Sequence, residues 1–582
     1  MTKTSKRNLL LAFCAATCLT VGLSAISTQT ASATGTTAGA TEFFMDNGAS
    51  VRVVEGESGI RWTTRVDETW YNDVTADATT VEFHTLVTAT DNVTSVEELV
   101  VGADASKEIK DLKAEVEVAD VAFDNYDTDG DGAADSTTKV FTYYGSIVYD
   151  NLTEDQTKAY ATELIARSYI SVDGTIYYAT AADTARDMRA VALAASEDEE
   201  KFAKFDEDEQ DIVKGYFGAK ETDVDLTSAE ADEKAYCFEA TNTVTASTAS
   251  DYAVAYLGAK RIGTVADDTV TLDSAKMTLG DSYALTVFDA DGNYAKVESF
   301  KYVTAAFDTA SELQTEFCNE GGTAVEKTGY YVITANIDMT DANYTTITAV
   351  TCNWTSRGLY MTLAGTFDGQ GHTISNLIFN PGYRTSNGGT SDNRSTGGFF
   401  GTLDGATIKD IAYTNVTSLK AGACGAIAAC VGAGRASLDN VYVSWSANTD
   451  FANFATKGGF VGTMETTGSR LLVNNCVVVM PTVENPVQGE ISGTHGLVVA
   501  TNGRYDKELT IRLTNCTFIG GNGQLTGFRT DYATDMGDGN SHNDSVVINQ
   551  TDVDVITLAD AATYDKSGWS AMQIAAWNAD NA

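Results

Sequence analysis

The sequence predicts a mainly β protein that ends in a right-handed parallel β-helix, with an Ig-like β-sandwich and an N-terminal α+β domain before it. The first observation is composition: the 582 residues include 50 Gly but only 3 Pro, which favours strands joined by tight turns. The second is a short pattern (apolar, spacer, Asn or Asp, apolar, spacer, apolar) that recurs between residues 364 and 518. The third is a Gly-containing strand pattern that alternates with it, at a spacing of about 30–40 residues that is typical of a solenoid.

Five segments are expected along the chain. A basic start and an apolar run precede Ala31-Ser32-Ala33, so residues 1–33 are predicted to be a signal peptide. Residues 41–217 are predicted to form the α+β domain, 218–235 a linker, 236–305 the Ig-like sandwich, and 306–582 the β-helix with a C-terminal cap. The signal peptide indicates a secreted, extracellular protein that can associate with a cell surface and has no stable membrane insertion once this segment is removed.

The net charge limits the classes of binding partner, and the cysteine count limits the possible disulfides. The net charge of −43 predicts repulsion from nucleic acid and anionic membranes, and it also suits solubility outside the cell. Seven Cys follow the predicted signal peptide, so at least one has no intramolecular disulfide partner. Cys476 and Cys516 fall in the same slot of neighbouring repeats, where strands about 4.8 Å apart allow a disulfide. Two buried, reduced thiols fit the same pattern equally well.

The α+β domain is predicted from its apolar periods. Strands are expected at 50–54, 59–66, 81–89, 139–149, 164–172 and 175–179, and helices at 185–195 and 206–216. Three stretches, Gly48-Ala49-Ser50-Val51-Arg52, Gly59-Ile60-Arg61-Trp62-Thr63 and Ala166-Arg167-Ser168-Tyr169-Ile170, resemble a poorly characterised module of large bacterial surface proteins. The resemblance implies a surface location and no particular chemistry.

A candidate metal site lies inside this domain. Asp127, Asp129 and Asp131 alternate, Gly132 is sixth in the run, and Asp135 is ninth, as in the first part of an EF-hand-like loop. The bidentate Glu of such loops is missing, because Thr138 stands at the twelfth position. We therefore expect a weak structural Ca²⁺ site with Asp127, Asp129, Asp131 and Asp135 as ligands, or else an acidic hairpin without an ion. No other cofactor is expected.

The segment after the predicted linker alternates in short apolar runs. Strands are expected at 252–257, 270–272, 282–288 and 294–303, with Asp289-Ala290-Asp291-Gly292-Asn293 as a hairpin turn. A helix at 308–317 is expected to close the first coil of the β-helix, and strands at 330–333 and 337–339 to begin it.

The repeat itself predicts a bend. Its copies are residues 374–379, 408–413, 438–443, 473–478 and 513–518. In the first copy Ile374 and Leu377 are three apart, so the period of two that keeps side chains on one face breaks at Asn376. Asn and Asp tolerate left-handed backbone, which predicts a bend there and amide hydrogen bonds between stacked coils. Residues 546–549 are a further strand candidate, although Gln550 stands in an apolar slot.

The C-terminus carries a helical stripe. Trp569, Met572, Ala576 and Trp577 lie on one face at helical spacing, which predicts a cap over the open end of the solenoid.

A second resemblance concerns the solenoid. The phrase from Phe367 to Leu377 (FDGQGHTISNL), followed by Gly398-Phe399-Phe400-Gly401, resembles the Gly-Leu-Phe-Gly-type (GLUG-like) repeats of bacterial surface β-helix proteins, over about residues 310–520. The resemblance implies that the repeat is structural and that the protein is secreted or wall-attached, often an adhesin.

The favoured function is non-enzymatic adhesion to a glycan or a host surface. Aromatic residues in or near the predicted solenoid loops can stack on sugars, and the candidates are Trp354, Tyr383, Trp445, Tyr505 and Tyr532. A polysaccharide lyase or glycoside hydrolase on a pectate-lyase-like solenoid is the alternative, and a structural surface-layer component is a third. Hydrolysis needs two facing carboxylates, and no such pair recurs on adjacent coils. His372 is a candidate base, but its Gly-rich turn favours a structural role, so no catalytic residue is predicted.

Overall fold

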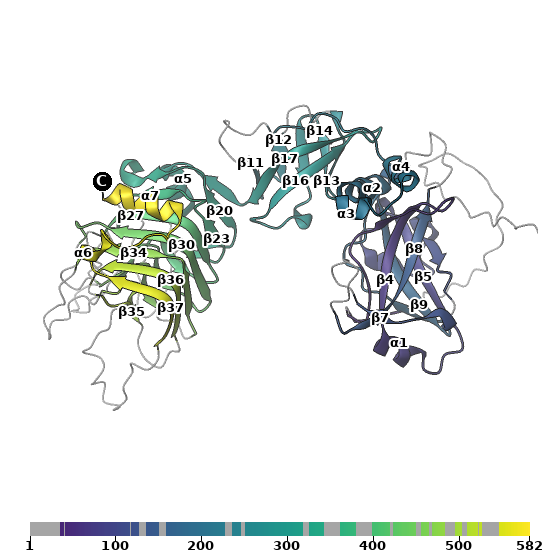
Figure 1. The fold of residues 1–582 in the computed structure, drawn as a ribbon, viewed down its shortest axis with the longest axis horizontal. Helices are drawn as coiled ribbons and strands as arrows, with labels where there is room; N and C mark the ends of the chain where they lie inside the picture. Colours follow the sequence, from purple (N-terminus) through teal and green to yellow (C-terminus); the bar gives the residue numbers. More distant parts are fainter. Residues whose placement is uncertain are drawn as a thin grey trace, which may run out of the picture. The chain divides into compact units, whose positions relative to one another are not determined.

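The computed structural model describes residues 35–39, 41–116, 118–126, 136–149, 159–226, 235–245, 251–317, 325–342, 361–379, 398–418, 423–449, 456–464, 468–482, 495–502, 509–521, 523–526 and 546–581. The chain divides into two compact units. The N-terminal unit runs to Phe300, except for residues 236–241 and 278–281, which belong with residues 301–582 in the C-terminal unit. The chain is mainly β, as predicted (Figure 1).

Two five-stranded sheets begin the N-terminal unit. The first has the order β1-β10-β9-β5-β6, and the second the order β2-β4-β8-β7 with β3 on β4. Apolar side chains between them, such as Phe43, Trp62, Phe83 and Tyr143, are buried. The strands are β1 (Thr36–Thr37), β2 (Phe43–Met45), β3 (Ser50–Arg52), β4 (Gly59–Asp67), β5 (Val81–Ala89), β6 (Lys110–Lys113), β7 (Asp124–Asn125), β8 (Lys139–Val148), β9 (Leu164–Val172) and β10 (Thr175–Tyr178).

Four helices accompany these sheets: α1 (Glu68–Thr75), α2 (Met188–Glu197), α3 (Glu199–Phe202) and α4 (Glu207–Lys214). Both expected helices are present, as α2 and α4. The Asp206 side chain accepts from the Glu209 N–H and the Glu209 side chain accepts from the Asp206 N–H, which forms a capping box at the start of α4. Sequence periodicity missed α1, which is only eight residues long with one buried side chain, Tyr71.

Residues 218–226, expected to be a linker, are instead packed. Val224 and Leu226 are buried, and the Glu221 and Val224 N–H groups donate to the Tyr294 and Lys296 carbonyls. These two apolar residues are too few to give a detectable sequence period. The rest of the expected linker, 227–234, lies outside the described residues.

A seven-stranded sheet follows, with the order β11-β17-β16-β13-β14-β15-β12. Its strands are β11 (Ala235–Phe238), β12 (Thr243–Thr245), β13 (Val254–Leu257), β14 (Lys260–Ala266), β15 (Thr269–Leu272), β16 (Ser282–Phe288) and β17 (Tyr294–Val303). The strands expected at 282–288 and 294–303 coincide with β16 and β17. All seven strands belong to one hydrogen-bonded sheet, so the pairing does not support the two separate sheets of an Ig-like sandwich.

The C-terminal unit is a β-solenoid over residues 325–556. One wall is the parallel sheet β19 (Val325–Lys327), β22 (Met361–Leu363), β26 (Phe400–Leu403), β29 (Ala428–Val431), β32 (Val461–Met464) and β35 (Val499–Asn502). The other wall is a twelve-stranded sheet, called here the long sheet. It contains β18 (Ala305–Phe307), β20 (Tyr330–Ile333), β21 (Ile337–Asp338), β23 (Thr366–Asp368), β24 (Thr373–Ser375), β25 (Ile378–Phe379), β27 (Thr407–Ser418), β30 (Arg435–Trp445), β33 (Arg470–Asn474), β34 (Val477–Met480), β36 (Leu509–Gly520) and β37 (Val546–Ile556).

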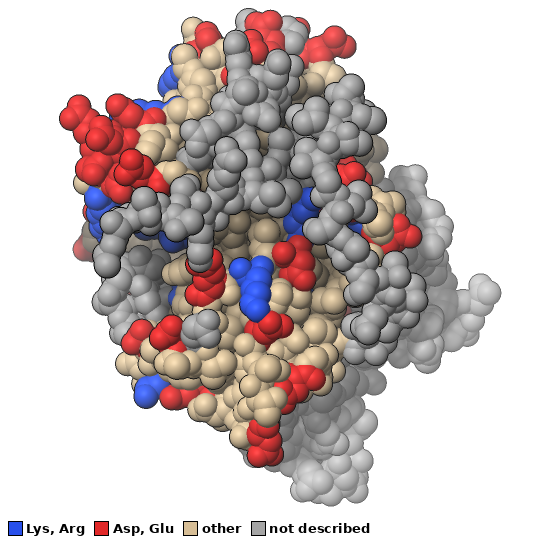
Figure 2. Space-filling view, turned by 90° about the vertical axis from the view of Figure 1, so that its right-hand side faces the viewer, with Lys and Arg blue, Asp and Glu red and all other residues tan. Residues whose placement is uncertain are grey.

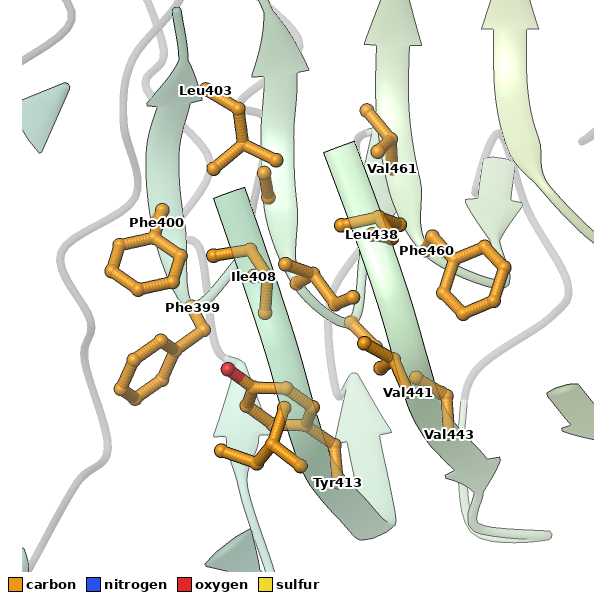
Figure 3. Close-up of a cluster of buried hydrophobic side chains, with 14 of the residues drawn as sticks. Phe399, Phe400, Leu403, Ile408, Tyr413, Leu438, Val441, Val443, Phe460 and Val461 are labelled. Atoms are coloured by element: carbon orange, nitrogen blue, oxygen red, sulfur yellow. The ribbon is translucent and has the colours of Figure 1, made fainter. Parts of the chain in front are cut away.

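The solenoid interior is filled by in-register apolar side chains. Ile408, Leu438, Val473 and Leu513 stack on successive coils and are fully buried. Side chains from both walls point into this interior (Figure 3). Helix α5 (Ala310–Phe317) closes the first coil as expected, because its Phe317 ring packs against rings of the first coils, including Tyr331 and Phe367.

The predicted bends are present. The φ angles of Asn376, Asp410, Asn440, Asn475 and Asn515 are all positive, between 51° and 60°. Their amides also bridge coils: the Asn440 Nδ2 donates to Asp410 Oδ1 at 2.7 Å, and the Asn515 Nδ2 donates to Asn475 Oδ1 at 3.3 Å. A further bend at Asp552, φ 52°, shows that β37 continues the repeat although Gln550 stands in the slot of Leu513.

One alignment of the repeat was wrong. Ile374 pairs with Tyr413, not with Ile408, and the residue paired with Ile408 is Phe367. Asn376 therefore stacks under Asn415, whose Nδ2 donates to Asn376 Oδ1 at 2.7 Å, and belongs to a second line of bends. The residues around both bends are similar, so the sequence pattern alone assigned both bends to a single line.

Replacement of Asn440 should separate the two roles of a bend residue. We expect Asn440→Ala to destabilise the chain by about 2–3 kcal/mol, because it loses the side-chain hydrogen bond and forces an alanine into left-handed backbone. Asn440→Gly keeps the backbone freedom and should cost only about 1 kcal/mol. Urea unfolding of both variants measures these changes. An equal loss of unfolding free energy in the two variants would contradict the backbone role assigned to Asn440.

The C-terminal helices do not cap the open end of the solenoid. Helix α7 (Ala571–Asp580) lies against β27 and β30 (Figure 1), and α6 (Leu558–Ala561) precedes it. Trp569 and Ala576 pack with Ala412, Tyr442 and Val477, which point outward from the long sheet. The expected cap is therefore a strap on the outer face. The outward apolar residues give the physical reason, because they need a cover of their own.

Candidate functional site

The strap leaves one part of the outer face of the long sheet open. Along each strand, residues before the bend alternate between the interior and solvent, so Ser437 and Asp439 point outward while Ala436 and Leu438 are buried. Outward residues after the bend, such as Tyr442, are covered by the strap. The open part, before the bends, is called here the exposed face.

Three arginines stand on the exposed face. Arg435 and Arg470 begin β30 and β33 and are paired in register, so two like charges sit on strands about 5 Å apart. Arg512 lies on the next strand, in register with Leu472. All three side chains are exposed, and among the described residues none of them forms an ion pair. Uncompensated arginines on neighbouring strands are notable in a chain of net charge −43, because like charges at this spacing repel.

A charged cluster occupies the first coils of the same face. The Asp368 carboxylate accepts from Lys301 Nζ at 2.9 Å and from the Tyr330 hydroxyl at 2.6 Å, and Lys409 Nζ lies 3.5 Å away. Burial opposes ionisation of Asp368, but the hydrogen bonds from Lys301 and Tyr330 and the two positive charges outweigh it, so its pKa is lowered. Burial, followed by the hydrogen bond to Asp368, raises the pKa of Tyr330.

This cluster is poorly suited to glycoside hydrolysis. A general acid needs a raised pKa, whereas the pKa of Asp368 is lowered. The other carboxylate in its row, Asp439, lies one strand beyond Lys409 and accepts from Asn475 Nδ2 at 3.0 Å. Asp368 and Asp439 are therefore both held by hydrogen bonds from neighbouring side chains on the described part of the exposed face.

The Asp368 cluster predicts a pH dependence of stability. Because the folded pKa of Asp368 is lowered, its contribution is present above the unfolded value of about 3.9 and is lost as pH falls through the folded value. We expect Asp368→Asn to cost about 1–3 kcal/mol at pH 7 and to flatten the fall in melting temperature below pH 4. Calorimetry of both proteins from pH 7 to pH 2 checks this, and parallel pH profiles would contradict it.

His372 lies in a tight turn, as its sequence context suggested. Its N–H donates to the Gly369 carbonyl at 2.8 Å, and the Ala412 N–H donates to the His372 carbonyl at 3.1 Å. A Cβ on Gly369 would lie 2.4 Å from Ile411 Cβ, so only glycine fits there. These contacts support the structural role.

Most of the predicted site residues lie outside the described residues. These are the candidate Ca²⁺ ligands Asp127, Asp129, Asp131 and Asp135 and the aromatic candidates Trp354, Tyr383, Tyr505 and Tyr532. Trp445 is described, and its predicted place in a sugar-binding loop is wrong. It ends β30, is only 4% exposed, and donates from Nε1 to the Gly459 carbonyl at 3.3 Å. Its ring fills the solenoid interior, where an apolar residue continues the inward pattern.

Cys476 and Cys516 are buried free thiols, which matches the second of the two interpretations. Burial, and then the neighbouring Cys516, raise the pKa of Cys476, so its thiolate is disfavoured. Among the described residues no group of three or more His, Cys, Asp and Glu side chains is placed to hold a metal ion. No helix in the described part of the chain is long and apolar enough to span a membrane.

Sequence reasoning missed the three arginines. Arg435 and Arg470 are 35 positions apart and differ in their neighbours, so they become one feature only when the coils are aligned in register. The signal was present, because each arginine stands shortly before an Asn bend strand.

Comparison with known proteins identifies no family for this chain. No family model matches the chain, and no curated protein matches it. A Bacteroides ovatus crystal structure, assigned provisionally as an immunoglobulin A1 protease, shares 13% identity over 47% of this chain and 87% of that one, with a TM-score of 0.22. A structure of an IgA1 protease shares 14% identity over 59% of this chain and 29% of that one, with a TM-score of 0.23. Scores this low carry no argument about activity.

Proposed function

We propose that this chain is a secreted, non-enzymatic binding protein that attaches to an acidic extracellular polysaccharide through the exposed face of its solenoid. The observation that carries the proposal is the set of three exposed arginines without ion pairs to described residues, Arg435, Arg470 and Arg512, on neighbouring strands of an otherwise acidic chain. The proposal of secretion rests on the signal-peptide pattern of residues 1–33.

An acidic polysaccharide fits these arginines better than nucleic acid does. Arg435 and Arg470 stand on neighbouring strands about 5 Å apart, and Arg512 stands on the next strand, two residues further along. A polyuronide carries one carboxylate on each sugar ring. Arginine binds carboxylates through two parallel hydrogen bonds. Hydroxyl-bearing Ser437 and Thr510 lie in the same two rows as the arginines, Thr514 lies one row nearer the bend, and all three suit sugar hydroxyls. The net charge of the chain repels the denser charge of nucleic acid.

The test is a panel of polysaccharides with the intact chain lacking residues 1–33. We expect binding of a polyuronide in low salt, no binding of a neutral glucan, and weakening of the binding as salt rises. Reducing ends and ultraviolet absorbance of unsaturated products are followed in the same samples. Release of products would establish the lyase or hydrolase alternative, and equal binding of the neutral glucan would reject the role of the arginines.

A further inference from the structure

A second face with arginine side chains, all half-buried, lies in the N-terminal unit, on the outer side of the sheet formed by β2, β3, β4 and β8. Arg52, Arg61 and Arg65 all point away from the buried side of this sheet. Arg52 and Arg61 belong to two of the three stretches that resemble a surface-protein module. This face takes no part in the solenoid site.

Two of the three arginines are neutralised. Arg65 pairs with Asp46, with Nη2 2.9 Å from Oδ2, and its Nη1 donates to Thr142 Oγ1 at 2.8 Å. Arg52 pairs with Glu57. Arg61 forms no ion pair among the described residues, although acidic side chains are twice as common as basic ones in this chain.

Arg61 is held in a fixed position by its neighbours. Its guanidinium carbon lies 4.6 Å from the centre of the Tyr144 ring, and its Nε donates to Ser50 Oγ at 3.2 Å. The Nε bond fixes the plane of the group, and no hydrogen bond to a described residue occupies its two Nη atoms. A planar fork of N–H donors fixed in this way is what a carboxylate binds most strongly.

Tyr144 lies beside Arg61 on the same face of the sheet. Its side chain is 45% exposed, which is unusual for a large aromatic residue on a sheet. Tyr144 pairs with Thr63, and Arg61 pairs with both Ser50 and Ser146, so three hydroxyl groups surround the pair. An aromatic ring, hydroxyl groups and one free guanidinium suit a sugar ring that carries a carboxylate.

We propose that Arg61 and Tyr144 form a binding site for a single carboxylated sugar residue, separate from the solenoid site and independent of the function proposed for it. Arg61 binds the carboxylate, the exposed edge of the Tyr144 ring contacts the sugar ring, and the Ser50, Ser146 and Thr63 hydroxyls face the sugar hydroxyls. Basic side chains lie among acidic ones on the side of the molecule that Figure 2 displays, and do not gather into one broad basic patch.

The experiment titrates the intact chain with glucuronate, glucose and glucose 6-sulfate, followed by saturation-transfer NMR and calorimetry. We expect binding of glucuronate and none of glucose. Arg61→Gln should weaken glucuronate binding by at least about tenfold, because it removes the charge and the fork. Tyr144→Leu should weaken it about fivefold and keep the charge. Lys204→Gln, which removes one exposed charge elsewhere in the unit, should change nothing.

A variant chain that lacks the solenoid arginines tests the two binding sites independently. In a chain with the changes R435E, R470E and R512E, glucuronate binding through Arg61 should persist. Its loss there, equal affinity for glucose, an unchanged affinity of Arg61→Gln, or a preference for the sulfate would each overturn the assignment. Melting curves of the variants establish that they are folded, and Tyr144→Leu tests the site if Arg61→Gln does not fold.

Discussion

Phe400→Ala is expected to destabilise the solenoid by about 3–5 kcal/mol, which is a large loss for a single substitution. The Phe400 ring is fully buried and lies 4.8 Å from Phe399, 5.3 Å from Phe367 and 5.4 Å from Phe317, measured between ring centres. Its removal leaves a cavity where helix α5 joins the first coils, and edge-to-face ring contacts are lost as well.

Urea unfolding of the intact chain measures this loss, and the transition of the C-terminal unit should move to lower urea. Val547→Ala is the control, because Val547 is 52% exposed on β37 and should change the stability by less than about 0.5 kcal/mol. Similar shifts for the two variants would show that the aromatic cluster does not anchor the solenoid.

Reversal of the three arginines of the exposed face, R435E, R470E and R512E together, is expected to weaken polyuronide binding by more than about a hundredfold. Each reversal replaces an attraction with a repulsion, and three charge-assisted contacts are lost together. The same change should leave the melting temperature unchanged or lower it slightly, because the paired positions 435 and 470 still carry like charges and the chain becomes more acidic.

Surface plasmon resonance on an immobilised polyuronide measures this effect. Lys204→Glu is the matched control for one reversed charge, because Lys204 is exposed and lies in the N-terminal unit. Undiminished binding of the triple variant would place the polysaccharide site elsewhere on the chain.

The bends were predictable from sequence because one local property decides them. Asn440 and its equivalents interrupt the inward period and tolerate positive φ, and both facts can be read from the letters. The register of the first coil was not predictable, because Asn376 and Asp410 sit in similar apolar contexts but belong to different lines of bends. Only strand pairing distinguishes the two lines.

Long-range packing explains the other differences. The apolar stripe of the last helix was visible in the sequence, but its docking site was not, because Ala412 and Tyr442 look like ordinary outward residues until the helix covers them. The residues next to Trp445 are of the kind found in loops, but Trp445 ends a strand and its ring lies in the interior. The arginines of the exposed face share no local pattern, and the register of the coils alone brings them together.

Hydrogen exchange of the intact chain with and without a polyuronide tests the proposed binding face most directly. We expect added protection at the start of β30, β33 and β36, where Arg435, Arg470 and Arg512 lie, and no change in the strands of the opposite wall, such as β29 and β32. Protection confined to the opposite wall, or none at a saturating polyuronide concentration, would contradict a binding face on the long sheet.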